Sequence, residues 1–166
     1  MTTQRAPNPP VILTVDDEPQ VLNAIERDLR RHFRNQYRII KAGSGKEALD
    51  VTERPKQRST PLALFFADQR MPGMTGTEFL AQARVLYHDA RKVLLTAYAD
   101  TEAAIASINR VGLDYYLMKP WDPLEERLFP ILDDLLSDWL RAAEDALVDP
   151  EIGQMRAIMA EYAAFL

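Results

Sequence analysis

The chain has 166 residues, 47% of them hydrophobic and 27% charged, and these ordinary globular values exclude a disordered polyelectrolyte. Its net charge of −5 argues against nucleic acid as a direct partner, and its lack of cysteine excludes disulfides, thiolate nucleophiles and cysteine-bound metals. Because the sequence shows neither a signal peptide nor an apolar run of the roughly 20 residues that a membrane span needs, we expect a cytoplasmic protein that makes no membrane contact.

Short apolar runs alternate with helical patterns along the chain. Runs rich in β-branched and aromatic residues predict strands at 11–15, 37–40, 62–67, 93–95 and 113–118. Apolar residues at helical spacing predict helices over about 19–33, 46–50, 79–86, 103–109 and 130–147. Ser44 and Glu47 form a capping box that opens the second helix, and residues 54–61 have the composition of a surface loop.

The apolar runs are nearly continuous, whereas half-exposed strands alternate apolar and polar residues. Continuous runs are typical of strands that are buried on both faces, which requires helices on both sides of a parallel sheet. The pattern therefore predicts an α/β domain with a five-stranded, parallel, doubly wound sheet. In such sheets the functional crevice lies beyond the carboxyl ends of the strands.

Charged and polar residues follow four of the predicted strands. Asp16 and Asp17 follow the first strand, Asp68 the third, Thr96 the fourth and Lys119 the fifth. Taken singly, each is most often a helix cap or a solvated surface group. Together they predict one crevice, in which three neighbouring carboxylates call for a divalent cation such as Mg²⁺. This chemistry suits phosphoryl transfer onto a carboxylate, for which Asp68 is the best nucleophile.

Four motifs carry a resemblance to a known family. They are VDDEP at 15–19, DQRMPGMTG at 68–76, LLTAYAD at 94–100 and DYYLMKPW at 114–121. In order and spacing they resemble the CheY-like receiver domain of two-component response regulators, over roughly residues 10–141. The resemblance implies the flavodoxin-like form of the doubly wound sheet.

The resemblance also implies roles for the acidic residues. Asp68 would be the phospho-acceptor, Asp17 a direct Mg²⁺ ligand and Asp16 its water-mediated companion. The backbone carbonyl of Arg70 would complete the metal ligands supplied by the protein. The Arg70 side chain and Thr75 depart from the usual pattern of the family, but neither removes a core group of the site.

Further roles in the switch come from the same resemblance. Thr96 would be the switch hydroxyl, Lys119 the lysine that pairs with the phosphoryl group, and Tyr116 the aromatic residue that turns inward when Thr96 moves. Pro120 matches a proline that follows a cis peptide bond in this family.

The function implied is a signalling switch that is not an enzyme. A histidine kinase or phosphotransfer protein would phosphorylate Asp68, and the switch would act by contact with a downstream protein, without a DNA-binding output. The stretch 113–139 looks most like receivers fused to a thioredoxin-reductase-like flavoprotein, although no such output is expected here. The alternatives are a pseudo-receiver scaffold or dimerisation module that phosphorylation does not control, and a phosphatase with a phospho-aspartate intermediate.

The sequence divides into three predicted segments. We expect a disordered N-terminal arm at 1–9, the receiver domain at 10–141 and a helical C-terminal extension at 142–166. Beyond Pro150, the sequence predicts a last amphipathic helix, whose apolar residues are Ile152, Met155, Ile158, Met159, Tyr162 and Leu166. This extension either folds back onto its own domain, or forms a homodimer or a docking helix for another protein.

Overall fold

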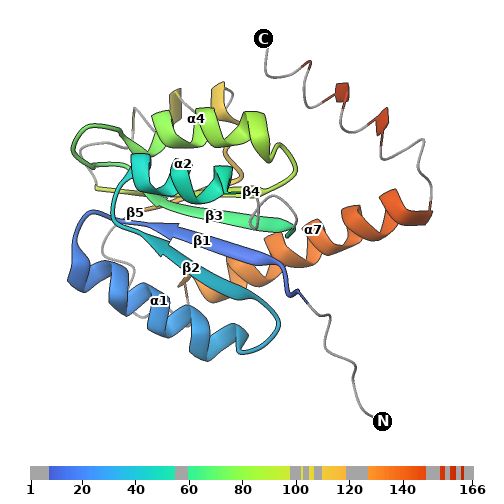
Figure 1. Cartoon of the computed structure of the whole chain (residues 1–166), viewed down its shortest axis with the longest axis horizontal. Coiled ribbons are helices and arrows are strands. Elements are labelled where there is room, and N and C mark those ends of the chain that lie inside the picture. Colours follow the sequence, from blue (N-terminus) through green and yellow to red (C-terminus); the bar gives the residue numbers. More distant parts are fainter. Residues whose placement is uncertain are drawn as a thin grey trace.

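The strands form one parallel sheet, as predicted. The computed structural model describes residues 8–54, 60–97, 102, 105–106, 110–118, 127–148, 154–155, 158–159 and 162. The strands are β1 (Val11–Val15), β2 (Arg38–Ala42), β3 (Leu62–Asp68), β4 (Arg91–Thr96) and β5 (Tyr115–Met118). Within the described residues they pair in the order β2-β1-β3-β4-β5 (Figure 1). The prediction of a doubly wound parallel sheet is therefore confirmed.

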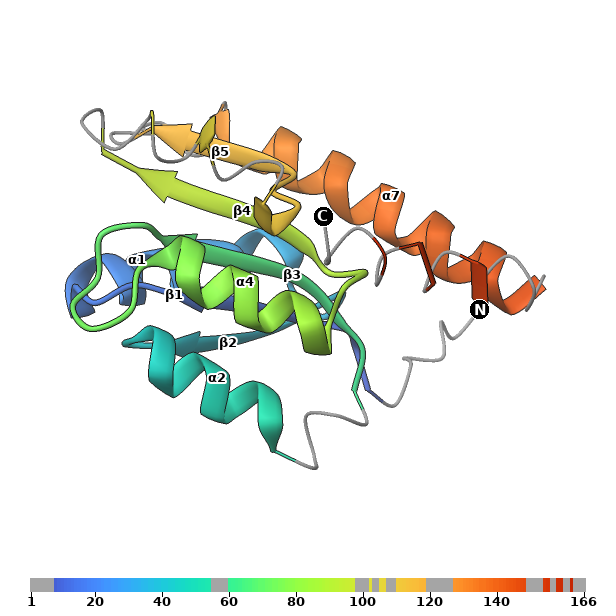
Figure 2. The ribbon, with the colours of Figure 1, turned by 90° about the horizontal axis from the view of Figure 1, so that it is seen from above.

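Helices cover both faces of this sheet. The helices with continuous described residues are α1 (Pro19–Phe33), α2 (Gly45–Glu53), α4 (Gly76–Leu86) and α7 (Phe129–Val148). Helices α2 and α4 lie on one face, and α1 and α7 lie on the other (Figures 1 and 2). Most of the helix predicted at 103–109 lies outside the described residues. Among those that are described, no helix is long and apolar enough to cross a bilayer.

Successive residues of each strand feed two separate cores. In β1, Val11 and Leu13 pack in the core on the α2 and α4 side, whereas Ile12 packs in the core on the α1 and α7 side. In β3, Phe65 and Phe66 divide between the two cores in the same way, and both are 0% exposed. This alternation explains why the strand sequences are apolar without interruption.

The start of α2 shows how local sequence sets a helix boundary. The Ser44 hydroxyl accepts a hydrogen bond from the Glu47 amide at 3.1 Å, as the capping box predicts. The Glu47 carboxylate accepts its reciprocal bond from the Gly43 amide at 2.9 Å, one residue before the cap. Both bonds satisfy amide groups that would otherwise lack partners near the helix start.

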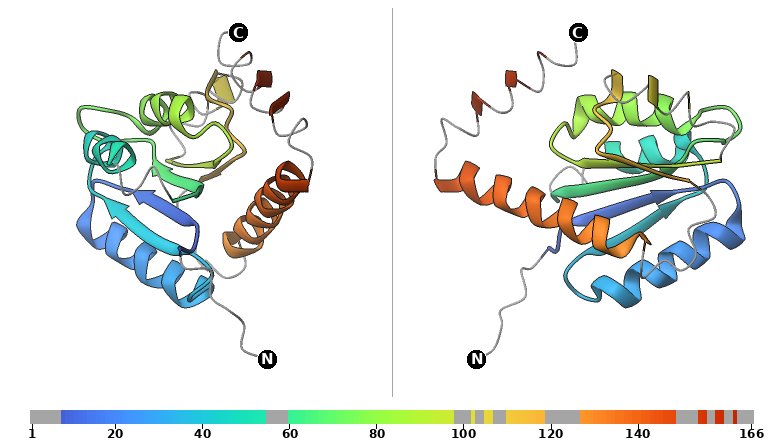
Figure 3. Two further views of the ribbon diagram at one scale, coloured as in Figure 1. Left: turned by 45° about the vertical axis from the view of Figure 1, so that its right-hand side comes forward. Right: turned by 180° about the vertical axis from the view of Figure 1, so that it is seen from behind.

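Helix α7 runs from the core past the edge of the sheet (Figure 3). Its first half is held by apolar contacts, with Leu132 and Leu136 at 0% and 2% exposure. An Arg91–Asp138 ion pair at 3.0 Å joins it to the start of β4. The helix continues without a break through Arg141 to Val148, so the predicted receiver and extension share one helix.

Lys92 is a buried cation at the start of β4. It is 3% exposed, and its Nζ donates hydrogen bonds to the carbonyl oxygens of Ala90 at 2.7 Å and His88 at 3.4 Å. Its amide donates to the Asp114 carboxylate at 2.7 Å. Burial lowers the pKa of Lys92 to about 8, and the nearby Asp114 only partly opposes this shift.

Shortening a core side chain of α7 should destabilise the protein. Leu132→Ala removes a fully buried side chain, and we expect it to lower the free energy of unfolding by about 2–5 kcal/mol. The matched change Leu140→Ala acts on a side chain that is 42% exposed and should cost much less. Urea unfolding measures both values. Equal losses would contradict the packing of α7 described above.

Lys92 should make stability depend on pH. Its folded pKa of about 8 lies below the ordinary value of 10.5, so between these values the unfolded chain holds a proton that the folded chain has released. The free energy of unfolding should therefore rise with pH across this interval, by on the order of 1–3 kcal/mol. Urea unfolding at several pH values should show this rise in the wild type and in Lys46→Met, which changes an exposed lysine, but not in Lys92→Met.

Candidate functional site

Three acidic residues meet where β1 and β3 end. In the sheet register Val15 pairs with Ala67, so Asp16 and Asp68 follow at neighbouring positions on adjacent strands. Carboxylate oxygens of Asp16, Asp17 and Asp68 all lie within 4.8 Å of one another. The strand order reverses its direction between β1 and β3, which is where ligands bind in sheets of this type. The predicted juxtaposition of these three carboxylates is thus observed.

Two of these carboxylates are buried. Asp16 is 0% exposed and Asp68 is 4% exposed. One oxygen of Asp16 accepts a hydrogen bond from the Glu18 amide at 2.9 Å, which fixes its orientation. Buried carboxylates this close cannot all be ionised at low cost unless a cation or a proton offsets their charge. Oxygen donors of this kind suit a hard divalent cation.

The cluster opens into a pocket at the sheet edge. The pocket is lined by residues from the ends of β1 and β3 and from the loops that follow β3 and β4, namely Asp17, Glu18, Asp68, Arg70, Met71, Pro72 and Ala97. A small ligand that enters it would therefore meet the Asp68 carboxylate directly. Arg70 is the one cationic side chain among these lining residues.

Thr96 lies at the same edge of the sheet. Asp68 pairs with Leu95, so Thr96 is the next residue of β4, immediately before the pocket residue Ala97. It is 0% exposed, and its hydroxyl has no hydrogen-bond partner among the described residues. A buried hydroxyl in this condition is uncommon in folded proteins and is available to a new acceptor.

The remaining predicted site residues are not part of the described cluster. Tyr116 lies on β5 opposite Leu94, packs against the core on the α4 side, and has its ring 6.5 Å from that of Tyr115. It lines a different hollow, which extends along β5 to Arg127. Lys119 and Pro120 lie outside the described residues.

The start of α4 packs directly against the backbone of Asp68. A Cβ built on Gly76 would lie 2.4 Å from the Asp68 carbonyl oxygen and 2.8 Å from Leu94 Cδ1. The Gln69 side chain accepts a hydrogen bond from the Thr77 amide at 2.9 Å, and its own amide donates to the Thr77 hydroxyl at 3.3 Å. These two hydrogen bonds hold the start of α4 to Gln69, the residue that follows Asp68.

Sequence reasoning missed this role of Gly76 and Gln69. The available signal was a glycine that opens a helix directly after the turn residue Thr75. Thr75 is the N-cap, and its hydroxyl accepts a hydrogen bond from the Glu78 amide at 3.2 Å. Capping explains how a threonine serves at the position where the family resemblance leads one to expect an acid.

Two glycine substitutions test two different causes of destabilisation, which are the close packing of Gly76 against Asp68 and the positive φ of Gly73. Gly76→Ala should destabilise the protein by about 1–3 kcal/mol because its methyl group overlaps the Asp68 carbonyl, although alanine normally favours a helix over glycine. Gly73→Ala meets no atom within 4 Å and should cost about 1–2 kcal/mol, solely through its φ of +78°. Urea unfolding measures the stability. Chemical shifts of the Asp68 and Leu94 amides should move only in Gly76→Ala, and a shift pattern confined to Gly73→Ala would contradict the close approach.

Known proteins resemble this chain over most of its length. The profile of the response regulator receiver domain matches residues 12–128. The hydrogenase transcriptional regulatory protein HoxA of Cupriavidus necator is 33% identical over 135 residues, which are 81% of this chain and 24% of that protein. The HoxA protein of Bradyrhizobium diazoefficiens is matched over 21% of its length, so this chain spans at most about a quarter of these two relatives.

Solved structures agree with this match. A CheY-like receiver domain protein from Methanospirillum hungatei is 28% identical, has a TM-score of 0.68, and aligns over 81% of this chain and 98% of its own. The response regulator TrrA from Thermotoga maritima, solved in complex with Mg(2+)-BeF, is 31% identical with a TM-score of 0.60, over 76% of this chain and 98% of its own. The chain therefore belongs to the response regulator receiver domain family of two-component systems.

Proposed function

We propose that this receiver domain is a phosphorylation-dependent switch whose acceptor is Asp68. The carrying observation is the cluster of Asp16, Asp17 and Asp68, whose oxygens lie within 4.8 Å of one another beside an open pocket. Asp68 is the member that ends the central strand β3, and it also lines the pocket. The donor would be a histidine kinase or a phosphotransfer protein, as the family implies.

The residues present fit Mg²⁺. Asp17 and Asp68 would bind the ion directly, Asp16 through water, and the backbone carbonyl of Arg70 would complete the set. The donors are hard oxygens, and two of the three carboxylates are buried, so a divalent cation offsets charge that the fold itself leaves concentrated. When bound, the ion neutralises charge on the phosphoryl oxygens.

The acceptor's own chemistry is a nucleophilic displacement. A carboxylate oxygen of Asp68 attacks phosphorus, an O–P bond forms, and the bond between phosphorus and the donor's imidazole nitrogen breaks, with the electron pair going to that nitrogen. The product is an acyl phosphate, with negative charge at a position where Asp68 is only 4% exposed. Lys119 would pair with this charge.

Thr96 is suited to respond to the added negative charge at Asp68. Its hydroxyl is buried without a partner among the described residues, so a phosphoryl oxygen offers it the hydrogen bond that it lacks. We propose that Thr96 then moves toward Asp68 and that Tyr116, which is packed at the edge of the core, turns inward. A local change in charge thereby shifts the domain between two states.

The output would be contact with a downstream protein in the cytoplasm, without catalysis and without DNA binding. The net charge of −5 supports a protein partner over a nucleic acid. A pseudo-receiver scaffold would keep the fold and lose the dependence on phosphorylation.

Phosphorylation by a small donor tests the proposal. With acetyl phosphate and Mg²⁺, the wild type should gain the mass of one phosphoryl group, and chelation of the metal should prevent this gain. Asp68→Asn should gain nothing, because it lacks the nucleophilic carboxylate. Asp50→Asn, a change at an exposed position of α2, should behave as the wild type does.

Two results would overturn this assignment. Equal labelling of the wild type and Asp68→Asn would place the acceptor elsewhere. Wild-type protein that binds neither Mg²⁺ nor a phosphoryl group, while remaining folded, would favour the pseudo-receiver alternative.

A further inference from the structure

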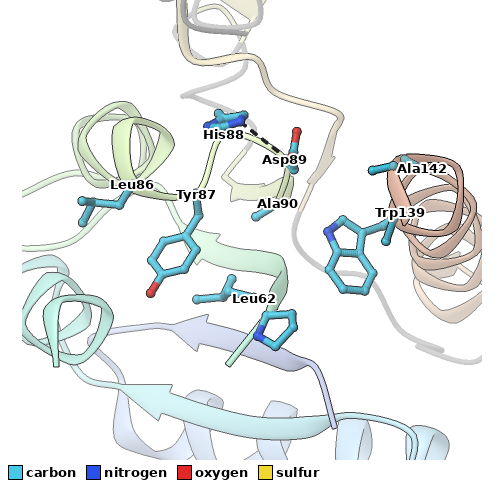
Figure 4. Close-up of a pocket in the computed structure, with 11 residues that line it drawn as sticks. Leu62, Leu86, Tyr87, His88, Asp89, Ala90, Trp139 and Ala142 are labelled. Carbon is cyan, nitrogen blue, oxygen red and sulfur yellow. Dashed lines mark ion pairs between the residues drawn. The ribbon is translucent and has the colours of Figure 1, made fainter. Parts of the chain in front are cut away.

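An apolar groove lies at the end of the sheet opposite the acidic cluster. Its floor and one wall come from the start of β3 and the turn between α4 and β4, and the other wall is the second half of α7. The lining residues are Pro61, Leu62, Leu86, Tyr87, His88, Asp89, Ala90, Trp139, Ala142, Ala143 and Ala146. Figure 4 shows Trp139 and Ala142 on α7 facing Leu62 and Ala90 across this groove.

The α7 wall is shaped to receive another helix. Its lining residues Trp139, Ala142, Ala143 and Ala146 follow the spacing i, i+3, i+4, i+7, which places them on one face of the helix. Three of these four residues are alanine, so the wall leaves room for large side chains from an occupant. The ion pair His88–Asp89, 3.6 Å apart, lies at the polar rim of the groove.

The C-terminal segment of the same chain carries a matching face. Met155, Ile158, Met159 and Tyr162 are helical in the structure and follow the same spacing. All four side chains are exposed, from 60% for Met155 to 71% for Tyr162. Burial of such a row of large apolar side chains would stabilise the protein, because it removes apolar surface from water.

The two sets of residues mirror each other about the Pro150–Glu151 bond. If the chain reverses there, Met155 lies opposite Ala146, Ile158 opposite Ala143, and Met159 opposite Ala142. Tyr162 then lies opposite Trp139, as an aromatic pair. Each large residue of the segment meets one residue of the groove wall, and no register shift is required.

The connection between the two helices suits such a reversal. Residues 149–153 read Asp-Pro-Glu-Ile-Gly, and short connections of this length join antiparallel neighbouring helices. As residue types, proline disfavours the continuation of a helix and glycine favours a tight turn. Because the connection is short, docking within one chain has a high effective concentration, which favours it over docking between chains.

We propose that the segment carrying Met155, Ile158, Met159 and Tyr162 docks as an antiparallel helix in this groove of its own chain, with these four side chains facing α7. The apolar face of the segment and the groove then cover each other. This inference concerns the opposite end of the sheet from the acidic cluster and does not depend on phosphorylation of Asp68.

Disulfide trapping tests the register in the full chain, which has no natural cysteine. The pairs Ala146→Cys with Met155→Cys and Ala143→Cys with Ile158→Cys should each oxidise rapidly to a monomer of altered mobility, because facing positions meet the geometry of a disulfide. The control pair Glu144→Cys with Met155→Cys uses an exposed position on another face of α7 and should oxidise slowly. The yield should not depend on protein concentration.

Other outcomes would overturn the proposal. Covalent dimers whose yield rises with concentration would assign the groove to a second copy of the chain, which is the homodimer alternative. Equal oxidation of the facing and control pairs, or none in either, would show that the segment does not dock in this register.

Fluorescence provides a second test without engineered cysteines. In a Trp121→Phe background Trp139 is the sole tryptophan, since the chain has two. Ile158→Asp should increase quenching of Trp139 by acrylamide and shift its emission to the red, whereas Arg156→Lys should leave both unchanged. No difference between Ile158→Asp and its parent would contradict docking.

Discussion

Electrostatic repulsion among three neighbouring carboxylates is the constraint on which the site depends. The oxygens of Asp16, Asp17 and Asp68 lie within 4.8 Å of one another, and two unit charges at about 4 Å repel by about 4 kcal/mol where the effective dielectric constant is near 20. The sheet keeps them together because β1 and β3 are adjacent parallel strands that end at the same level. The charge of the pocket is therefore expected to depend on whether a cation or a proton is bound there.

The fold prevents the simplest relief of this repulsion, which is for Asp68 to move away. Strand β3 is buried along its whole length between two cores. Helix α4 packs against the Asp68 carbonyl through Gly76, and Gln69 holds the same helix by hydrogen bonds to Thr77. Since the backbone is fixed on both sides, the repulsion is relieved by a cation, a proton or a covalent change at the carboxylate.

The sequence was sufficient for the sheet and for the acidic cluster, and insufficient for the contacts that hold the cluster in place. Continuous apolar runs such as 62–67 identify buried parallel strands, and acids that follow two such strands must meet if the strands are neighbours. Gln69 is held by hydrogen bonds to Thr77, and the buried Lys92 donates a hydrogen bond to the Ala90 carbonyl. Only the packing of the folded chain brings these partners into position. Residue type alone favoured a surface location for both side chains.

Helix α4, like strand β3, runs from the acidic cluster to the apolar groove. It begins at Gly76 beside Asp68 and ends at Leu86, which lines the groove, over a length of about 16 Å. A helix this short transmits only displacement as a rigid body, so coupling between the two sites would require α4 to occupy two positions. The contact at Gly76 and the hydrogen bonds from Gln69 hold its first turn in one place. Docking at the groove and the proposed phosphorylation of Asp68 are therefore not expected to be coupled through α4.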